Sequence, residues 1–377
     1  MTRIAIVSGI CVADDAISAA VASQATMLHG LDGIDSVDVF AQMCDRALPC
    51  DAHTVASSWE LLCHERFQQA DVAIFHWGIH FDLFDAISIM RGRVDDARGP
   101  LPVVHFHNCT PPELVDGDRH LTIDRSIAQG QLVVGSDVPV WTFSPFNEAT
   151  LLGWGVRPAQ IRFVPFAVEP PRPLRARRQE GHVSLACVGR MVPAKAQHVV
   201  IEAVAALPGM IRDRVTLRIA GNARFSSAEY VASLEELIVE HDLCGTVRMV
   251  GQPDDDGLWR LYEESDILIA PSQHEGLCVP VLEAYHAGCR IIGSDAGNLP
   301  FIVQAPDPVF PVDDSRSLAV AIEQVASEVL CGTRVDRTSV AELLQSYSDE
   351  SARTCVDAAL RSLMSRQPDA PRAIGAT

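Results

Sequence analysis

The chain lacks the patterns that most often assign a nucleotide-binding function from sequence alone. It has no P-loop of the form G-x-x-x-x-G-K-[ST], and the first apolar run continues as Ser8-Gly9-Ile10-Cys11 instead of G-x-G-x-x-G. The first absence disfavours a P-loop kinase or ATPase, and the second disfavours a dinucleotide-dependent dehydrogenase.

Basic charge is also scarce. The 377 residues include 30 Lys and Arg against 49 Asp and Glu, which gives a net charge of −19. This balance disfavours nucleic acid as the main partner, because phosphate backbones bind to basic surfaces. It likewise disfavours electrostatic adhesion to anionic membranes. A small anionic ligand remains compatible, since exposed charges beyond about 8–10 Å are screened and local groups dominate.

Paired cysteines and long apolar runs are missing too. The eleven cysteines form no C-x-x-C pair, and the closest two are Cys44 and Cys50. This spacing indicates free thiols in a reducing compartment, with neither a disulfide framework nor a zinc site. No apolar run reaches the ~18 residues of a membrane span, and the segment from Arg3 to Val7 is typical of a strand, not of a signal peptide. We therefore expect a cytoplasmic protein without a transmembrane segment, in which peripheral membrane contact stays open.

What the chain does contain is an alternation of short apolar runs and helix-like segments. Its length favours two domains. Near-continuous apolar strands separated by helices predict parallel sheets covered on both faces. The expected strands are Ile4–Val7, Val37–Phe40, Val72–Phe75, Val103–Phe106, Val140–Phe143 and Ile161–Val164, then Val183–Val188, Val215–Ala220, Val247–Val250, Ile267–Ala270 and Arg290–Gly293.

A stretch rich in proline and arginine, from Glu169 to Arg178, interrupts the alternation and predicts a linker. The fold class is therefore α/β, with two Rossmann-like domains whose parallel sheets face a central cleft. Ligands of such sheets bind at the carboxyl ends of strands, so the cleft is the expected site. The expected division is a first domain at 1–170, a linker at 171–181, a second domain at 182–345, and a C-terminal helix with a loose tail at 346–377.

Two carboxylates eight positions apart form the most informative motif, which runs from Pro271 to Ala284. Glu275 precedes Gly276 after a buried strand, and Glu283 lies within a helix-like apolar run. A strand that turns through glycine into a helix exposes free N–H groups, which suit anions. The carboxylates beside them suit hydroxyl groups. The alternative is a capping carboxylate followed by a solvated helix residue.

Two cations follow another expected strand, and two histidines mark the end of the expected strand Val103–Phe106. Arg190 and Lys195 come after Val183–Val188 and suit a diphosphate, although they could be solvated surface charges. His105 and His107 point the same way at period two. They could be structural, could bind zinc with His76 or His80, or could face the cleft as hydrogen-bond donors or proton handlers. Acids at Asp254–Asp256 predict a helix start.

Taken together, these motifs resemble the retaining glycosyltransferases of GT-B fold in family 4, also called group 1. The resemblance is carried by the E-x7-E element, by Gly189-Arg190 with Lys195, and by Gly293-Ser294-Asp295-Ala296-Gly297-Asn298-Leu299-Pro300. The first half is similar to one branch of the family. The runs that match are Asp15-Ala16-Ile17-Ser18, His76-Trp77-Gly78 and His107-Asn108-Cys109-Thr110-Pro111-Pro112-Glu113.

The chain also departs from the family at two places. The first loop lacks the usual double glycine, and Phe301 stands where glutamate is frequent. Asp116-Gly117-Asp118 has the D-x-D form of metal-dependent glycosyltransferases of the other major fold, but its flanks favour a surface turn.

The resemblance implies transfer of a hexose from a UDP- or GDP-sugar to a saccharide, a lipid-linked acceptor or a small molecule. It implies retention of configuration, with no metal and no cofactor. Arg190 and Lys195 would neutralise the diphosphate, Glu283 would bind ribose, and His107 would contact the donor sugar near the reacting carbon. Glu275 would hold sugar hydroxyls. The other implied donor-binding residues are Gly9, Gly276, Leu277, Cys278 and Val279.

Two other classes of function stay open at this point. One is a nucleotide-sugar epimerase of GT-B fold, which releases product without an acceptor. The other is a non-catalytic module that binds a sugar nucleotide and leaves it unchanged.

Overall fold

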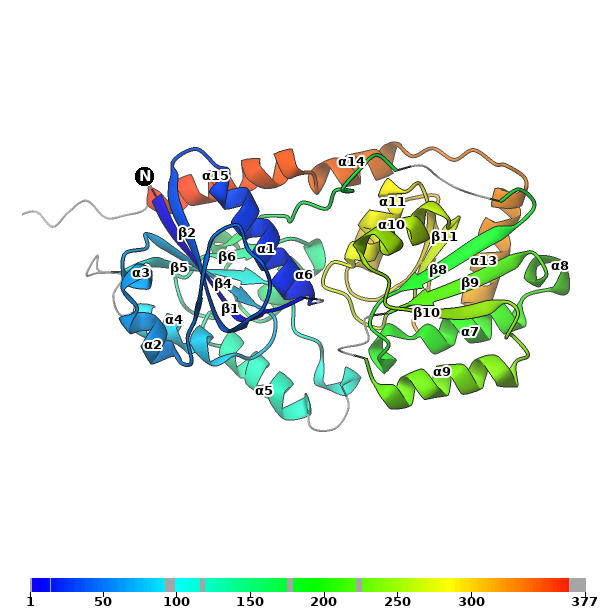
Figure 1. Cartoon of the computed structure of the whole chain (residues 1–377), viewed down its shortest axis with the longest axis horizontal. Helices are drawn as coiled ribbons and strands as arrows, with labels where there is room; N and C mark the ends of the chain where they lie inside the picture. The colour runs from blue at the N-terminus through cyan, green and yellow to red at the C-terminus, as the bar shows by residue number, and fades with distance from the viewer. Residues whose placement is uncertain are drawn as a thin grey trace, which may run out of the picture.

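The computed structural model describes residues 2–13, 15–91, 99–115, 119–174, 179–221 and 226–365. The chain forms two α/β domains that lie side by side along its long axis (Figure 1). The first has a seven-stranded sheet in the order β3-β2-β1-β4-β5-β6-β7, and the second has a six-stranded sheet in the order β10-β9-β8-β11-β12-β13. Every neighbouring pair is parallel, which confirms the predicted fold class.

All six strands predicted for the first domain are present, and β3 is an addition. The segment 55–70 forms two short helices because the backbone of His64 is extended between them. The elements are β1 (Thr2–Cys11), α1 (Ala16–His29), β2 (Ile34–Cys44), β3 (Asp51–Thr54), α2 (Ser58–Cys63), α3 (Glu65–Gln68), β4 (Val72–Trp77), η1 (Asp82–Asp85), α4 (Ala86–Arg91), β5 (Leu101–Phe106), η2 (Pro112–Leu114), α5 (Arg119–Gly130), β6 (Val140–Thr142), α6 (Pro145–Gly153), η3 (Pro158–Gln160) and β7 (Ile161–Phe163).

All five strands predicted for the second domain are present, and β13 is an addition. Asp254 caps a helix by accepting a hydrogen bond from the Gly257 N–H at 2.7 Å, which confirms the helix start expected there. The elements are β8 (Val183–Val188), η4 (Pro193–Lys195), α7 (Gln197–Ala206), α8 (Gly209–Arg212), β9 (Val215–Ala220), α9 (Ala228–Glu240), β10 (Val247–Gly251), α10 (Asp255–Glu263), β11 (Ile267–Ala270), α11 (Val279–His286), β12 (Arg290–Ser294), α12 (Leu299–Ile302), β13 (Val309–Phe310), α13 (Ser315–Leu330), α14 (Thr338–Ser346) and α15 (Asp349–Met364).

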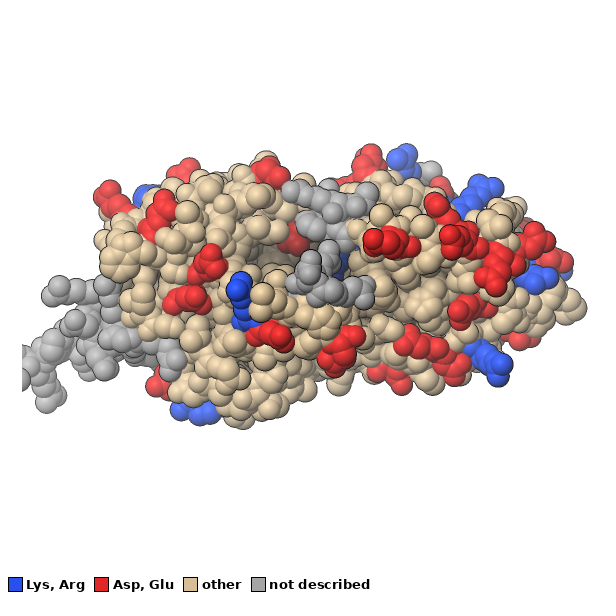
Figure 2. All heavy atoms as spheres, turned by 90° about the horizontal axis from the view of Figure 1, so that it is seen from below, with Lys and Arg blue, Asp and Glu red and all other residues tan. Residues whose placement is uncertain are grey.

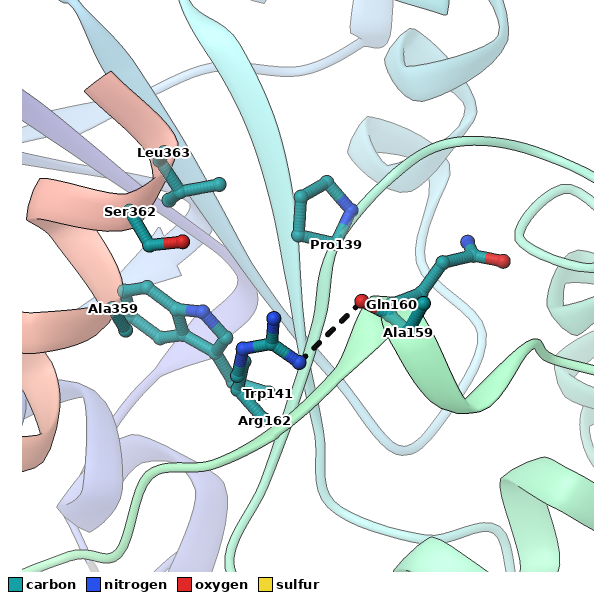
Figure 3. Close-up of a pocket in the computed structure, with 8 residues that line it drawn as sticks. All are labelled: Pro139, Trp141, Ala159, Gln160, Arg162, Ala359, Ser362 and Leu363. Atoms are coloured by element: carbon teal, nitrogen blue, oxygen red, sulfur yellow. Dashed lines mark hydrogen bonds between the residues drawn. The ribbon is translucent and has the colours of Figure 1, made fainter. Parts of the chain in front are cut away.

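The last helix returns to the first domain. Buried residues of α15, among them Val356 and Leu360, pack into the same core cluster as Ile4, Ile6 and Val21, and Figure 1 shows α15 lying across the first domain. A small hollow separates part of α15 from the β6–β7 edge (Figure 3). Its lining consists of Pro139, Trp141, Ala159, Gln160, Arg162, Ala359, Ser362 and Leu363.

The chain therefore crosses between the domains twice, and the two crossings touch. The Val168 N–H donates to the Tyr347 carbonyl at 2.9 Å. The hydroxyl of Tyr347 donates to the Phe143 carbonyl at 2.8 Å, and the His286 Nε2 bonds to the Val168 carbonyl at 2.8 Å. Next to them, Arg172 forms two hydrogen bonds with the carboxylate of Glu263, at 2.9 and 3.0 Å.

Both sheets reverse their strand order at the first strand of each domain. In the second sheet β8 lies between β9 and β11, so the loops after β8 and β11 flank the point where ligands of such sheets bind. A hollow lies near the junction of the two domains on the face shown in Figure 2, where acidic side chains far outnumber basic ones.

Three expectations fall outside the described residues. They concern Asp116 and Asp118, the arginines at 175–178 and the tail at 366–377. Within the described ranges, no helix is long and apolar enough to cross a membrane.

Candidate active site

The E-x7-E element spans a loop and a helix, as its glycine and proline predict. Glu275 lies in the loop that follows β11, and α11 begins at Val279 with Pro280 in its first turn. The turn into the helix is made at Cys278, whose φ of 68° is in the left-handed region. Glu275 and Glu283 are therefore placed by different backbone elements, one by the loop and one by the second turn of α11.

The turn exposes a row of backbone donors. Within the part of the chain that the structure describes, the N–H groups of Gly276, Leu277, Cys278 and Val279 donate to no protein acceptor. Free N–H groups at the start of a helix, together with the positive end of its dipole, favour an anion. This geometry fits the phosphate-binding role that these residues were expected to have.

Glu275, in the loop after β11, forms an ion pair with Lys195, in the loop after β8. The Lys195 Nζ lies 2.5 Å from one carboxylate oxygen of Glu275, and the Ser272 hydroxyl donates to the same oxygen at 2.7 Å. Burial by itself would raise the pKa of Glu275, but Lys195 and the hydrogen bonds from Ser272 and Cys278 outweigh it, so the pKa lies below its usual value. Glu275 is therefore ionised at neutral pH.

Lys195 is the only lysine of the chain, and the other 29 of its 30 Lys and Arg residues are arginines. It follows β8 in a short 3₁₀ turn, η4, and Ala196 then adopts a left-handed conformation before α7. Arg190, in the same loop, is exposed, and its guanidinium has no ion pair among the described residues. The loop thus offers one cation held by a carboxylate and one that is free to meet a ligand.

Glu283 has one partner and one open oxygen. The Tyr262 hydroxyl donates to its Oε2 at 2.8 Å, and no described group bonds to Oε1. The pKa of Glu283 lies above its usual value, mainly because the carboxyl is buried. The hydrogen bond from Tyr262 opposes this shift, and the nearby charge of Asp255 adds to it. A half-buried carboxylate with one fixed and one open oxygen can accept hydrogen bonds from a pair of ligand hydroxyls.

His107 lies at the end of β5 and bonds to a second histidine. Its Nε2 is 2.9 Å from the Nδ1 of His76, and its ring stacks on Phe166 at 5.3 Å between centroids. His105 lies beside both rings. Yet no group of His, Cys, Asp or Glu among the described residues is arranged to hold a metal ion. The zinc alternative for these histidines is therefore not supported, and His80 is not part of the cluster.

The E-x7-E loop touches the first domain directly. His274 Nε2 bonds to the Asn108 Oδ1 at 3.0 Å. A Cβ placed on Gly276 would lie 2.9 Å from the His107 carbonyl oxygen, so only glycine allows this approach. The loop after β5 and the loop after β11 therefore meet, and they bring His107 to the same place as Glu275.

Gly9 does not lie in a loop, contrary to expectation. It is part of β1, which continues to Cys11, and a Cβ on it would lie 2.7 Å from the Cβ of Phe81. Close packing against Phe81 is a sufficient reason for glycine here. Two features of the site were not expected from the sequence: the Tyr262 partner of Glu283, and the ion pair that joins Lys195 to Glu275.

Comparison with known proteins assigns the second domain. Residues 175–332 match the family model described as "Glycosyl transferases group 1". The second domain is a group 1 glycosyl transferase domain. The match includes the whole loop after β8, the E-x7-E element and α11.

Curated relatives of this glycosyl transferase domain are named D-inositol 3-phosphate glycosyltransferase. One from Saccharomonospora viridis is 31% identical over 38% of this chain and 35% of its own length. Another, from Salinispora arenicola, is 26% identical over 72% of this chain and 70% of its own length. The matched part thus spans only about a third of the first relative.

Solved structures show the same fold over nearly the whole chain. Sucrose-phosphate synthase from Thermosynechococcus elongatus superposes with a TM-score of 0.73 at 18% identity, covering 97% of this chain and 100% of that one. Anabaena Alr3699/HepE in complex with UDP-glucose gives a TM-score of 0.74 at 15% identity, covering 96% and 100%. The group 1 glycosyl transferase domain is therefore the second half of a complete GT-B fold.

Proposed function

We propose that the protein is a retaining glycosyltransferase that moves a hexose from a UDP- or GDP-sugar to a hydroxyl of its acceptor. The observation that carries this proposal is the meeting of four groups at the carboxyl ends of two adjacent strands. These are the Lys195–Glu275 pair, the unpartnered Arg190, the four free N–H groups at the start of α11, and the open oxygen of Glu283. A nucleotide sugar needs cations and N–H donors for its diphosphate, and acceptors for its hydroxyls.

Each group has a separate task in this reaction. The free N–H groups and Arg190 bind the diphosphate, whose negative charge grows as the sugar leaves, so these preplaced groups stabilise the transition state. Glu283 accepts hydrogen bonds from the ribose hydroxyls. Glu275 is held ionised by Lys195 and binds hydroxyls of the sugar, and His107 contacts the sugar from the first domain.

Retention is proposed because the motifs of the chain resemble those of retaining group 1 glycosyltransferases. The described carboxylates of the site are already engaged, Glu275 by Lys195 and Glu283 by Tyr262. Neither is placed as a nucleophile, which favours front-face attack by the acceptor hydroxyl. Contact between the loops after β5 and β11 excludes water and limits hydrolysis of the donor. The donor is a substrate, and we propose that no further cofactor or metal takes part.

The acceptor is a saccharide, a lipid-linked saccharide or a small molecule. The acidic surface in Figure 2 favours an acceptor that does not require an anionic lipid surface. All eleven cysteines are free, which fits the cytoplasm as the place of the reaction.

A thermal-shift panel of UDP, GDP, ADP and dTDP with their sugars tests the donor. A ligand at 100 times its dissociation constant stabilises the fold by about 2.7 kcal/mol. We expect one base to stand out, and Glu283→Ala and Lys195→Ala to abolish transfer while the fold remains. NMR of the product then gives the anomeric configuration.

Three outcomes contradict the proposal. Product release without any acceptor indicates an epimerase, and binding without turnover indicates a binding module. Wild-type transfer in both variants contradicts the assignment of the site.

A further inference from the structure

Three side chains of the first domain connect His107 to a backbone carbonyl. His107 Nε2 lies 2.9 Å from His76 Nδ1, and His76 Nε2 lies 2.7 Å from Gln24 Oε1. Gln24 Nε2 lies 3.2 Å from His105 Nδ1, and His105 Nε2 lies 3.2 Å from the Val164 carbonyl oxygen. We call His107, His76, Gln24 and His105 the histidine relay. The last three are at most 1% exposed.

The carbonyl at the end of this relay sets the direction of every bond in it. A carbonyl only accepts, so His105 Nε2 carries the hydrogen, and the Nδ1 of the neutral ring must accept. Gln24 therefore turns its NH₂ to His105 and its oxygen to His76. The Nε2 of His76 then donates, and its Nδ1 accepts from the Nε2–H of His107. The reverse order would place a lone pair of His105 against the carbonyl of Val164.

All three imidazoles are neutral at physiological pH. Burial is the largest cause in each case. It lowers the pKa of His105 to about 3. It also lowers the pKa values of His76 and His107 well below 6.5, and the neighbouring histidines add to the shift of these two. A neutral relay needs no counterion, and each donor in it meets one acceptor.

The open end of the relay is the Nδ1 of His107. This nitrogen carries no hydrogen when Nε2 does, and no described group bonds to it. It is also not among the fully buried polar atoms that lack a partner in the described part of the chain. The ring is held in place by Phe166, which stacks on it, and by Phe143 at 5.3 Å. A lone pair of fixed direction therefore remains for a ligand.

We propose that Gln24, His76 and His105 are positioning residues that hold His107 as its Nε2–H tautomer, with Nδ1 as a hydrogen-bond acceptor for a hydroxyl of the donor sugar. The contact with the sugar rests on the proposed function, whereas the tautomer does not. The sequence left His107 open as a donor or a proton handler, and the relay makes it an acceptor. A hydroxyl can donate to such a nitrogen, whereas a phosphate or carboxylate oxygen without a hydrogen cannot.

The tautomer can be measured in the free protein. Protein labelled with ¹⁵N at histidine gives separate signals for protonated and unprotonated ring nitrogens, and His107→Asn identifies those of His107. We expect a single Nε2–H tautomer of His107 that does not change between about pH 8 and about pH 6. Signals of the Nδ1–H tautomer or of an imidazolium in the wild type overturn the proposal.

Gln24→Leu tests whether the relay sets this tautomer. Without the amide, His76 loses its acceptor and can reverse, so His107 becomes a mixture of both tautomers. Gln24→Met, which keeps a straight chain of similar volume, replaces this variant if the leucine protein does not fold. Gln160→Leu is the matched control, because Gln160 is a buried glutamine whose amide bonds to the Val138 carbonyl and to Arg157 and to no member of the histidine relay. A single tautomer of His107 in the Gln24 variants overturns the positioning role of Gln24.

Binding of UDP and UDP-glucose tests the contact with the sugar. We expect Gln24→Leu to leave UDP affinity unchanged and to weaken UDP-glucose about twofold, because an even mixture keeps half of the protein in the accepting tautomer. His107→Ala weakens UDP-glucose at least as much. Equal losses for both ligands overturn the contact. If wild-type protein binds neither ligand nor the GDP pair, the proposed function fails while the tautomer result stands.

Discussion

Replacing Lys195 by methionine tests the ion pair on which the site is built. Methionine keeps the unbranched stem and removes the charge. The Lys195 and Glu275 side chains are 19% and 12% exposed. Breaking a fully buried pair costs about 3–5 kcal/mol, while an exposed pair contributes up to about 1 kcal/mol. Because this pair is mostly but not fully buried, we expect a loss of about 2–3 kcal/mol in the free energy of unfolding near neutral pH.

The pH dependence of this loss separates an electrostatic cause from simple damage to packing. In the wild type, the folded pKa of Glu275 lies below its usual 4.5. The stabilisation is therefore complete above about 4.5 and disappears as the pH falls through the lower folded pKa. Without Lys195, burial prevails and raises the folded pKa of Glu275 above 4.5. Protonation of Glu275 then removes an unpaired buried charge and so stabilises the variant. The difference between the two proteins must shrink as the pH falls from about 7.5 to about 5.

Urea unfolding followed by tryptophan fluorescence measures this difference, since Trp259 is buried in the second domain and reports on it. The double variant Lys195→Met with Glu275→Gln removes both charges and should recover most of the stability. A loss that is independent of pH, or a double variant no more stable than the single one, would refute the reasoning. Lys195→Arg should keep the stability but lose transfer, because a planar guanidinium does not replace a compact ammonium.

Three further predictions concern the rest of the site. Tyr262→Phe removes the hydroxyl that fixes Glu283, and calorimetry should show UDP binding weakened about five- to tenfold. Tyr230→Phe is the control: Tyr230 bonds to His198, remote from Glu283, and its loss should leave UDP binding unchanged. Gly276→Ala should lower transfer about a hundredfold more than it lowers UDP affinity, because its Cβ would push the loop after β11 away from the loop after β5. Gly209→Ala serves as the control, since Gly209 has open space around it. Transfer should persist in EDTA, and loss of activity that Mg²⁺ or Mn²⁺ restores would contradict the metal-independent mechanism.

The strands and the loops of the site could be predicted because parallel strands are buried on both faces. Each such strand is a continuous apolar run, and the polar residues that follow it mark the ligand-binding edge. Two strands were not predicted. β3 consists of Asp51-Ala52-His53-Thr54 and has no apolar run to reveal it, and β13 is only the two residues Val309–Phe310. Helix α6 begins at Pro145 behind the capping hydroxyl of Ser144, and this pairing of serine with proline is a start signal that is readable in the sequence.

The side-chain partners could not be predicted, because they depend on how distant loops meet. Lys195 and Glu275 are 80 positions apart, and the sequence placed each at a strand end without joining them. The direction of the histidine relay depends on a backbone carbonyl, at Val164, that no side-chain pattern marks. The apolar run that predicts β1 ends at Val7, whereas the strand itself continues through Gly9 to Cys11.

The return of α15 means that the first domain is not one continuous piece of chain, because its core is completed by a helix that follows the whole second domain. A protease cut between the two sheets, at residues 164–182, would leave an N-terminal fragment whose core lacks Val356 and Leu360, and a C-terminal fragment that carries them. Each fragment would expose apolar surface that only the other can cover, so the nicked protein should remain a single particle under native conditions. Swapping the first domain between relatives therefore requires moving two segments of the gene, one from each end.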